Sequence, residues 1–205
     1  MLSFRAISLY LVATLASVSL TSAAPAPCNG CDVSSGNGGG LTPVPVILAD
    51  CGAKIDPLLA QIDALAVIKA NTVGPLVADI TAVIDDATAK VQAMVDAKVD
   101  LNVALAADVN GGAAISVQAF ADIFVKLILS ITVCIQVALK LVAQADLTAV
   151  IKIFAALFVS MTAFIQVCFL LVVELKAILV VQISMFIQLG IKLGVGAAVG
   201  FLGYN

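Results

Sequence analysis

The sequence predicts an all-α protein in which long amphipathic helices are followed by very apolar helices. We expect a helical bundle or hairpin with at least one candidate transmembrane helix. Hydrophobic residues make up 62% of the 205 residues and charged residues 11%, against roughly 45–50% and 25% in ordinary globular domains. Residues 153–173 contain no charge, Gly or Pro, and as a helix they would reach roughly 31 Å, the thickness of a bilayer core. Residues 75–109 carry apolar side chains at alternating steps of three and four, which is typical of a half-buried helix.

Residues 1–23 have the pattern of a secretory signal peptide. Arg5 precedes an uncharged apolar run from Ile7 to Leu20, and small residues then lead to a cleavage site after Ala23. A first membrane anchor is the alternative, but the apolar run is short. The sequence therefore predicts entry into the secretory pathway, with residence in a membrane of the cell surface or, alternatively, outside the cell.

Residues 24–55 are rich in Cys, Pro and Gly and predict a tether. An oxidising compartment permits disulfides, so a bridge is expected among Cys28, Cys31 and Cys51, for instance from Cys51 to either of the others. The C-x-x-C that Cys28 and Cys31 form lacks the strand–helix context of a redox motif and the second pair of a zinc site. A structural disulfide is the favoured interpretation.

Residues 56–111 predict an acidic, amphipathic helical region. Asp56-Pro57 is a helix start signal, and Gly74-Pro75 is expected to separate a first helix from a second one that runs to about Val109. From residue 24 to 111 the chain carries ten Asp and four Lys, a net charge of −6. The buried seam of the second helix is predicted to be Val77, Ile80, Ile84, Ala87, Val91 and Met94.

Residues 112–205 predict an apolar, membrane-associated helical region. Ser116 is expected to cap a third helix that ends near Ala145, and Asp146 or Thr148 to cap a fourth from about Leu147. One unbroken helix is the alternative. Residues 123–142 and 153–172 align at an offset of thirty with ten identities, which favours two helices and raises an internal duplication as a hypothesis.

Four glycines near the C-terminus predict close helix packing. Gly190 with Gly194, and Gly196 with Gly200, form two small-xxx-small pairs of the kind that lets membrane helices approach each other. A loosely ordered glycine-rich tail is the alternative, because Gly disfavours helix by about 1 kcal/mol per residue.

The sequence predicts no catalytic, cofactor-binding or metal-binding residue, and therefore no enzyme. It has no His, which removes the usual general base and the commonest zinc ligand, and its only Glu is Glu174. It has no basic patch for nucleic acid. The expected partner is membrane lipid or another hydrophobic surface, with a homo-oligomer as a further possibility.

Two functions follow from this composition. The first is a non-enzymatic integral or membrane-associated protein of the secretory pathway or cell surface. The alternative is a soluble, secreted, surface-active or lipid-binding helical protein, whose apolar helices cover a ligand, an interface or each other.

The chain combines four features: a predicted signal peptide, a short Cys/Pro/Gly region, the helix entry CGAKIDPLL at 51–59 and predicted helices rich in Ala, Val and Ile. In this combination the chain resembles small secreted or transmembrane proteins of basidiomycete fungi. The resemblance implies a helical protein of the secretory pathway and brings no site residue with it.

Overall fold

A computed structural model describes residues 41–109, 112–197 and 200 of the chain. The described residues are all-α and contain no β-strand, which confirms the predicted fold class. Their seven helices are α2 (Val44–Asp63), α3 (Ala70–Asp96), α4 (Leu101–Ala104), α5 (Val117–Lys140), α6 (Leu147–Leu171), α7 (Leu175–Gln182) and α8 (Ser184–Lys192). The predicted signal peptide and most of the predicted tether lie outside these residues.

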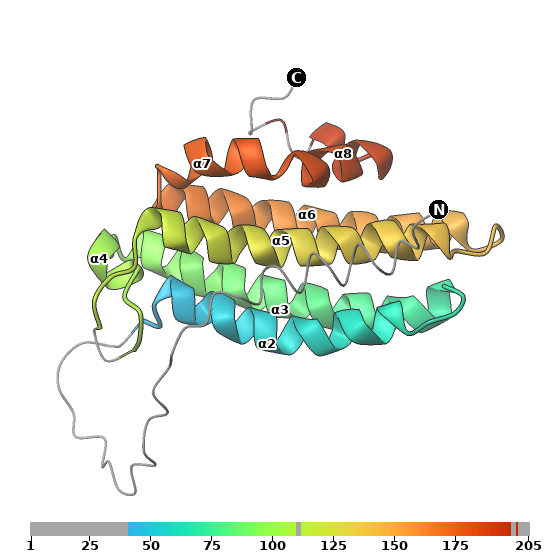
Figure 1. Cartoon of the computed structure of the whole chain (residues 1–205), viewed down its shortest axis with the longest axis horizontal. Coiled ribbons are helices and arrows are strands. Elements are labelled where there is room, and N and C mark those ends of the chain that lie inside the picture. The colour runs from blue at the N-terminus through green and yellow to red at the C-terminus, as the bar shows by residue number, and fades with distance from the viewer. Residues whose placement is uncertain (1–40, 110–111, 198–199, 201–205) are drawn as a thin grey trace, which may run out of the picture. The chain divides into compact units, whose positions relative to one another are not determined.

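Two antiparallel helical hairpins, α2–α3 and α5–α6, lie side by side (Figure 1). α2 packs along α5, and α3 packs along α6. Both of these neighbouring pairs run parallel (Figure 1). A thiol–carbonyl contact joins Cys134 to Leu59 and a hydrogen bond joins Ser160 to Asp85, each across 75 positions of sequence. The same register continues at the hairpin turns, where Ile68 forms an isolated parallel bridge with Val142.

The chain reverses after α6, and α7 and α8 then lie along the second hairpin (Figure 1). The reversal contains neither Gly nor Pro. Its turn is closed by the Leu175 amide, which donates to the Val172 carbonyl at 3.0 Å. The segment from Val173 to Ala177 contains no turn sequence, so the sequence does not predict this reversal.

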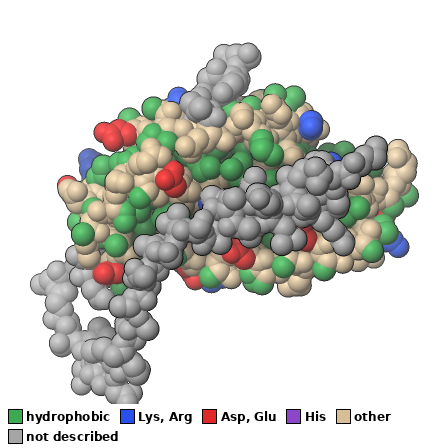
Figure 2. Space-filling model, viewed as in Figure 1, with side chains coloured by type: hydrophobic (Ala, Val, Ile, Leu, Met, Phe, Trp, Pro, Cys, Tyr) green, Lys and Arg blue, Asp and Glu red, His purple; other side chains and the backbone are tan. Residues whose placement is uncertain are grey.

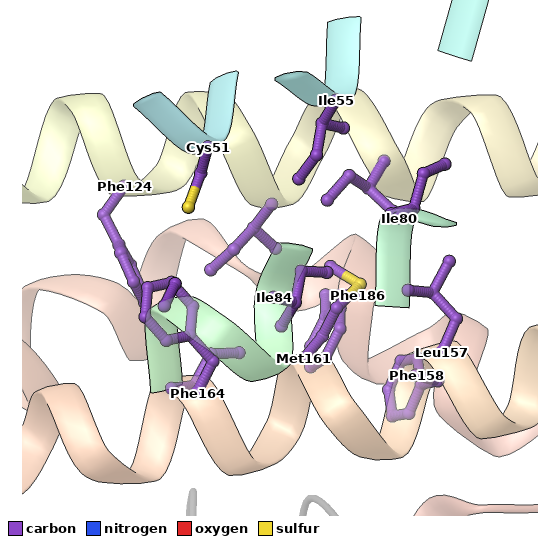
Figure 3. Packing of buried hydrophobic residues seen from close by; sticks show 14 of the residues in the cluster. Cys51, Ile55, Ile80, Ile84, Phe124, Leu157, Phe158, Met161, Phe164 and Phe186 are labelled. Atoms are coloured by element: carbon purple, nitrogen blue, oxygen red, sulfur yellow. The ribbon is translucent and has the colours of Figure 1, made fainter. Parts of the chain in front are cut away.

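One hydrophobic core joins helices of both hairpins with α7 and α8. Phenylalanine rings occupy its centre, and five of them are fully buried: Phe120, Phe124, Phe154, Phe158 and Phe186. The rings of Phe158 on α6 and Phe186 on α8 stack with centroids 4.1 Å apart, while Cys51 and Ile55 of α2 point into the same core (Figure 3). The apolar helices are thus the inner part of a bundle whose other members include α2 and α3.

The predicted seam of the acidic region is confirmed. All six of its residues lie in α3 with at most 2% of their surface exposed, and they face α2 and α6. The charged residues of α3 lie on the opposite side and are exposed. Among them Asp86 and Lys90 form the expected ion pair, with 2.7 Å between the carboxylate and the ammonium group.

The predicted boundary between the third and fourth helices is also confirmed. The Ser116 hydroxyl accepts from the Ala119 amide at 3.1 Å and caps α5. α5 ends at Lys140, and α6 begins at Leu147 with Asp146 in the N-cap position. The predicted cap itself is wrong, because the Asp146 side chain accepts no capping hydrogen bond.

Three predicted helix ends are wrong. α2 begins at Val44 and runs through Asp56-Pro57. This is tolerated because Pro57 lies on the exposed side of α2, as does Ala53, whose carbonyl loses its helical donor. α3 likewise begins at Ala70, so Gly74-Pro75 falls inside it.

The end of α3 is the third difference, since this helix stops at Asp96 and not near Val109. Lys98 adopts a left-handed conformation with φ of 50°. The Lys98 amide donates to the Val95 carbonyl at 3.0 Å and the Val99 amide to the Met94 carbonyl at 3.1 Å. These two bonds form a Schellman motif, which glycine usually makes and which the sequence pattern therefore hides.

The two aligned apolar segments have matching environments in α5 and α6. Thr132 and Thr162, equivalent at the offset of thirty, are both buried, and their hydroxyls donate to the carbonyls of Ile128 and Phe158 at 2.7 and 2.9 Å. This agreement fits an internal duplication, which stays a hypothesis.

Candidate lipid-facing surface

The exposed charged side chains of the first hairpin, α2–α3, are spread along its surface and do not form a cluster. Lys90 donates a hydrogen bond to Asp86 and lowers the pKa of that carboxyl group, whereas the adjacent Asp85 accepts from the Ser160 hydroxyl on α6. Within the described ranges, no three residues among His, Cys, Asp and Glu are placed to share a metal ion.

Cys51 is the described member of the predicted disulfide set. It lies in α2, is 3% exposed and points into the core (Figure 3). Burial, and secondarily the nearby Asp50 carboxylate, raise the pKa of its thiol to about 11. Cys28 and Cys31 lie outside the described residues, so the bridge stays a prediction.

The four predicted packing glycines have different positions. Gly190 is buried in α8 and faces α6: a Cβ atom there would lie 2.7 Å from Cε1 of Phe158. Gly194 has a φ of 76° and follows the end of α8, where its amide and that of Val195 close a Schellman motif onto the Ile191 and Gly190 carbonyls. Gly196 has only ordinary contacts with Ile191, and Gly200 is half-buried. Close helix approach through a glycine is thus seen at Gly190, inside the bundle.

α5 and α6 are both long and apolar enough to cross a membrane. Length and composition alone give this result, and the core helices of a soluble bundle give it too. In the most apolar 18-residue window of each helix, 44% of the α5 residues and 50% of the α6 residues are buried. About half of each window therefore lies at or near the surface of the bundle.

α3, which packs along α6, carries exposed charged residues. Asp79, Asp85, Asp86 and Lys90 are exposed, and Asp85 contacts α6 directly at Ser160. If α6 crossed a bilayer in this arrangement, these groups would lie at bilayer depth, where each charge costs about 2.5–3.5 kcal/mol. These charges would oppose insertion of α6 while the bundle stays closed.

The outward side of α6 forms a stripe with no charge between Lys152 and Glu174. Its exposed members are Ala156, Val159, Ala163, Gln166 and Leu170. Most of these side chains are small or polar, and the exposed carboxylate of Asp85 lies beside the stripe at Ser160. The stripe is uncharged but offers little apolar surface.

A second group of exposed residues, which we call the apolar end, lies where α3 and α6 both finish. It comprises five exposed aliphatic residues from the segment around α4 and from the α6–α7 turn: Leu101, Val103, Val109, Leu170 and Val173. α4 and the α6–α7 connection lie at the same end of the bundle (Figure 1). Val173 is 78% exposed, the largest fraction among the exposed large hydrophobic residues in the described part of the chain.

Sequence reasoning missed the apolar end. It placed Val103 and Val109 in a continuing helix and Val173 inside a membrane span, because the helix ends at Asp96 and Leu171 are not marked by Gly or Pro. The available signal was three valines that fall outside the seam of their helices. On the face seen in Figure 2, hydrophobic and charged side chains are interspersed, so exposed apolar residues are not restricted to one region.

No protein family, no curated protein and no solved structure matches this chain.

Proposed function

We propose that this chain is a non-enzymatic, membrane-associated protein of the secretory pathway or cell surface that binds lipid as a closed helical bundle. The observation that carries the proposal is the length and apolar composition of α5 and α6, together with the exposed aliphatic side chains on these two helices, Ile123, Val159 and Leu170. Aliphatic surface that remains uncovered in water favours contact with another apolar surface. Bilayer lipid supplies such a surface to a protein of the secretory pathway.

The charges of α3 support peripheral over integral association. Asp85 contacts α6 at Ser160, so insertion of α6 within the closed bundle would carry this carboxylate to bilayer depth, which is costly. An integral protein, with α5 and α6 as two spans, is the second candidate and is favoured by their length and composition.

Membrane fractionation of the natively expressed protein with a C-terminal tag tests the proposal. We expect the processed protein in the membrane pellet at neutral pH and its release by an alkaline carbonate wash. Retention after the wash would favour the integral candidate. Protein found in the culture medium is then floated with phosphatidylcholine vesicles, and failure to bind both cell membranes and vesicles would refute membrane association.

A further inference from the structure

We infer that the outward side of α5 is a contact surface for a second copy of this chain, which packs its own α5 against it in the antiparallel direction. We call this surface the α5 face. Its six residues recur at alternating steps of four and three: Asp122, Lys126, Leu129, Val133, Gln136 and Lys140. This spacing places them on one side of the helix. Formation of this dimer does not depend on the proposed binding of lipid.

The helices packed on α5 cover its other sides. α2 lies on one side of α5, and α7 and α8 lie on the other (Figure 1). Asp122, Lys126 and Lys140 are exposed. Leu129 and Val133 are half-buried, but they belong neither to the described hydrophobic core nor to the layer of aliphatic side chains packed against it. The remaining apolar surface of these two residues favours contact with another molecule.

The ends of the α5 face are charged and its centre is not. All three charged residues of α5 belong to this face, and no charge lies between Lys126 and Lys140. The Gln118 side chain donates a hydrogen bond of 2.9 Å to the Asp122 carboxylate and so holds this acid on the surface of α5. The complementary partner therefore presents an apolar centre, a base that meets Asp122 and an acid that meets Lys140.

The order of residues along the α5 face makes the face complementary to itself. Its members form three pairs that are equidistant from position 131: Asp122 with Lys140, Lys126 with Gln136, and Leu129 with Val133. A two-fold axis at this position brings the Asp122 carboxylate opposite the Lys140 ammonium group of the second copy, at both ends of the contact. The aliphatic pair meets in the middle, and the Lys126 ammonium group can donate to the side-chain oxygen of Gln136.

A parallel pairing of the same two faces is unfavourable. It would place each charged residue opposite its own copy, so that Asp122 faces Asp122 and each lysine faces a lysine. Like charges in direct contact destabilise an interface. A lipid surface also fits poorly, because the Asp122 carboxylate would be carried towards hydrocarbon together with Leu129. The order of charges therefore favours an antiparallel second copy.

Charge reversal tests the pairing at the two ends. Sedimentation equilibrium of the full processed chain measures the dissociation constant of the dimer. Asp122→Lys and Lys140→Asp are each expected to raise this constant about tenfold, because attraction becomes repulsion at both ends, and the double variant is expected to restore it. Lys152→Glu, which reverses an exposed lysine on α6, is the matched control and should have no effect. A monomeric wild-type chain, or a double variant weaker than both single ones, would overturn the inference.

Cysteine cross-linking tests the direction of the contact. Chains whose five native cysteines are replaced by Ala carry either Leu129→Cys or Val133→Cys. The antiparallel contact brings position 129 of one copy against position 133 of the other. An equimolar mixture is therefore expected to form the mixed disulfide in preference to either symmetrical one, which mass spectrometry distinguishes. A preference for the symmetrical products would indicate another contact and overturn the inference.

Flotation with phosphatidylcholine vesicles separates this dimer from the proposed function. Asp122→Lys is expected to float as the wild-type chain does, because the α5 face contacts protein and not lipid. Weaker flotation of Asp122→Lys, with an unchanged dissociation constant, would assign the α5 face to lipid and overturn the inference. A dimeric wild-type chain that binds neither vesicles nor cell membranes would refute the proposed function and support the dimer.

Discussion

At Gly190, α8 approaches α6 so closely that no side chain fits between the two helices. A Cβ atom would meet the Phe158 ring, and that ring is held in place by its stack with Phe186. We expect Gly190→Ala to lower the free energy of unfolding by about 1–3 kcal/mol, the usual cost of overpacking a core. Urea denaturation followed by circular dichroism measures this change.

Gly52 provides the control for this substitution. It lies inside α2, and a Cβ atom there would have no neighbour within 4 Å. We expect Gly52→Ala to raise the free energy of unfolding by about 0.5–1 kcal/mol, because alanine loses less backbone entropy in a helix. Equal effects of the two substitutions would contradict the close contact at Gly190.

The Cys51 thiol is expected to react slowly in the folded protein. Burial raises its pKa from 9.0 to about 11, so the reactive thiolate is scarce at neutral pH and reagents reach it poorly. Because the folded state holds this proton more tightly, the associated stability is present below pH 9 and is lost as the pH rises towards 11.

Iodoacetamide labelling with mass spectrometry checks this expectation. Cys51 should be labelled slowly at pH 8 in buffer and quickly in denaturant. A Cys51 that reacts equally fast in both would contradict its burial. One that stays unlabelled in denaturant until a reductant is added would show that Cys51 is in a disulfide, and mass spectrometry of the unreduced peptides would then test the predicted partners Cys28 and Cys31.

At the scale of whole helices, the C-terminus of α3 ends in a strained backbone conformation that one substitution can relieve. Lys98 occupies a left-handed position that costs a residue with a side chain about 1–2 kcal/mol. We expect Lys98→Gly to raise the melting temperature, with a gain of about 1 kcal/mol, because glycine adopts this conformation without a steric penalty.

The equivalent position after α8 provides the reverse substitution. Gly194 has a φ of 76° in the same motif, and a Cβ atom there would contact nothing within 4 Å. Gly194→Ala should therefore lower stability by about 1 kcal/mol through backbone strain alone. A neutral result for both Lys98→Gly and Gly194→Ala would show that these conformations are not maintained in solution.

Sequence patterns identified the helices better than their ends. The seam from Val77 to Met94 and the Ser116 cap follow local rules of periodicity and hydrogen bonding, and both are present in the structure. The ends of α2 and α3 follow tertiary context instead: Pro57 is tolerated because it faces water, and Lys98 replaces the expected glycine. Local propensity cannot anticipate either outcome.

For the whole molecule, a disulfide between α3 and α6 tests whether lipid binding needs the bundle to open. The contact between Asp85 and Ser160 makes Asp85→Cys with Ser160→Cys a suitable pair, introduced into a chain whose five native cysteines are replaced by Ala. We expect vesicle binding to be the same in the oxidised and reduced forms, because the proposed association with lipid leaves the bundle closed.

A single-cysteine variant serves as the control. Asp85→Cys alone, in the same chain without native cysteines, cannot close the bridge between α3 and α6. If oxidation of the α3–α6 pair abolished binding and reductant restored it, while the single-cysteine variant was unaffected, the helices would have to separate on lipid. That result would favour insertion of α5 and α6.

The arrangement of the two hairpins could not be predicted from the sequence. The composition indicated that the apolar surfaces of α5 and α6 must be shielded from water. Whether lipid or other helices shield them depends on contacts between segments that are distant in sequence. The structure supplies α2, α3, α7 and α8 as neighbours. The apolar end was hidden for the same reason, since Val103 and Val173 share an end only after both hairpins have packed.

The spacing of 75 positions between the paired contacts of the two hairpins has a consequence during synthesis. At about 5–20 residues per second, each part of α2–α3 is made roughly 4–15 s before the part of α5–α6 that covers it. In that interval the nascent first hairpin displays the seam of α3 with no partner from the second. A chaperone that recognises aliphatic surface would meet this seam before α6 does.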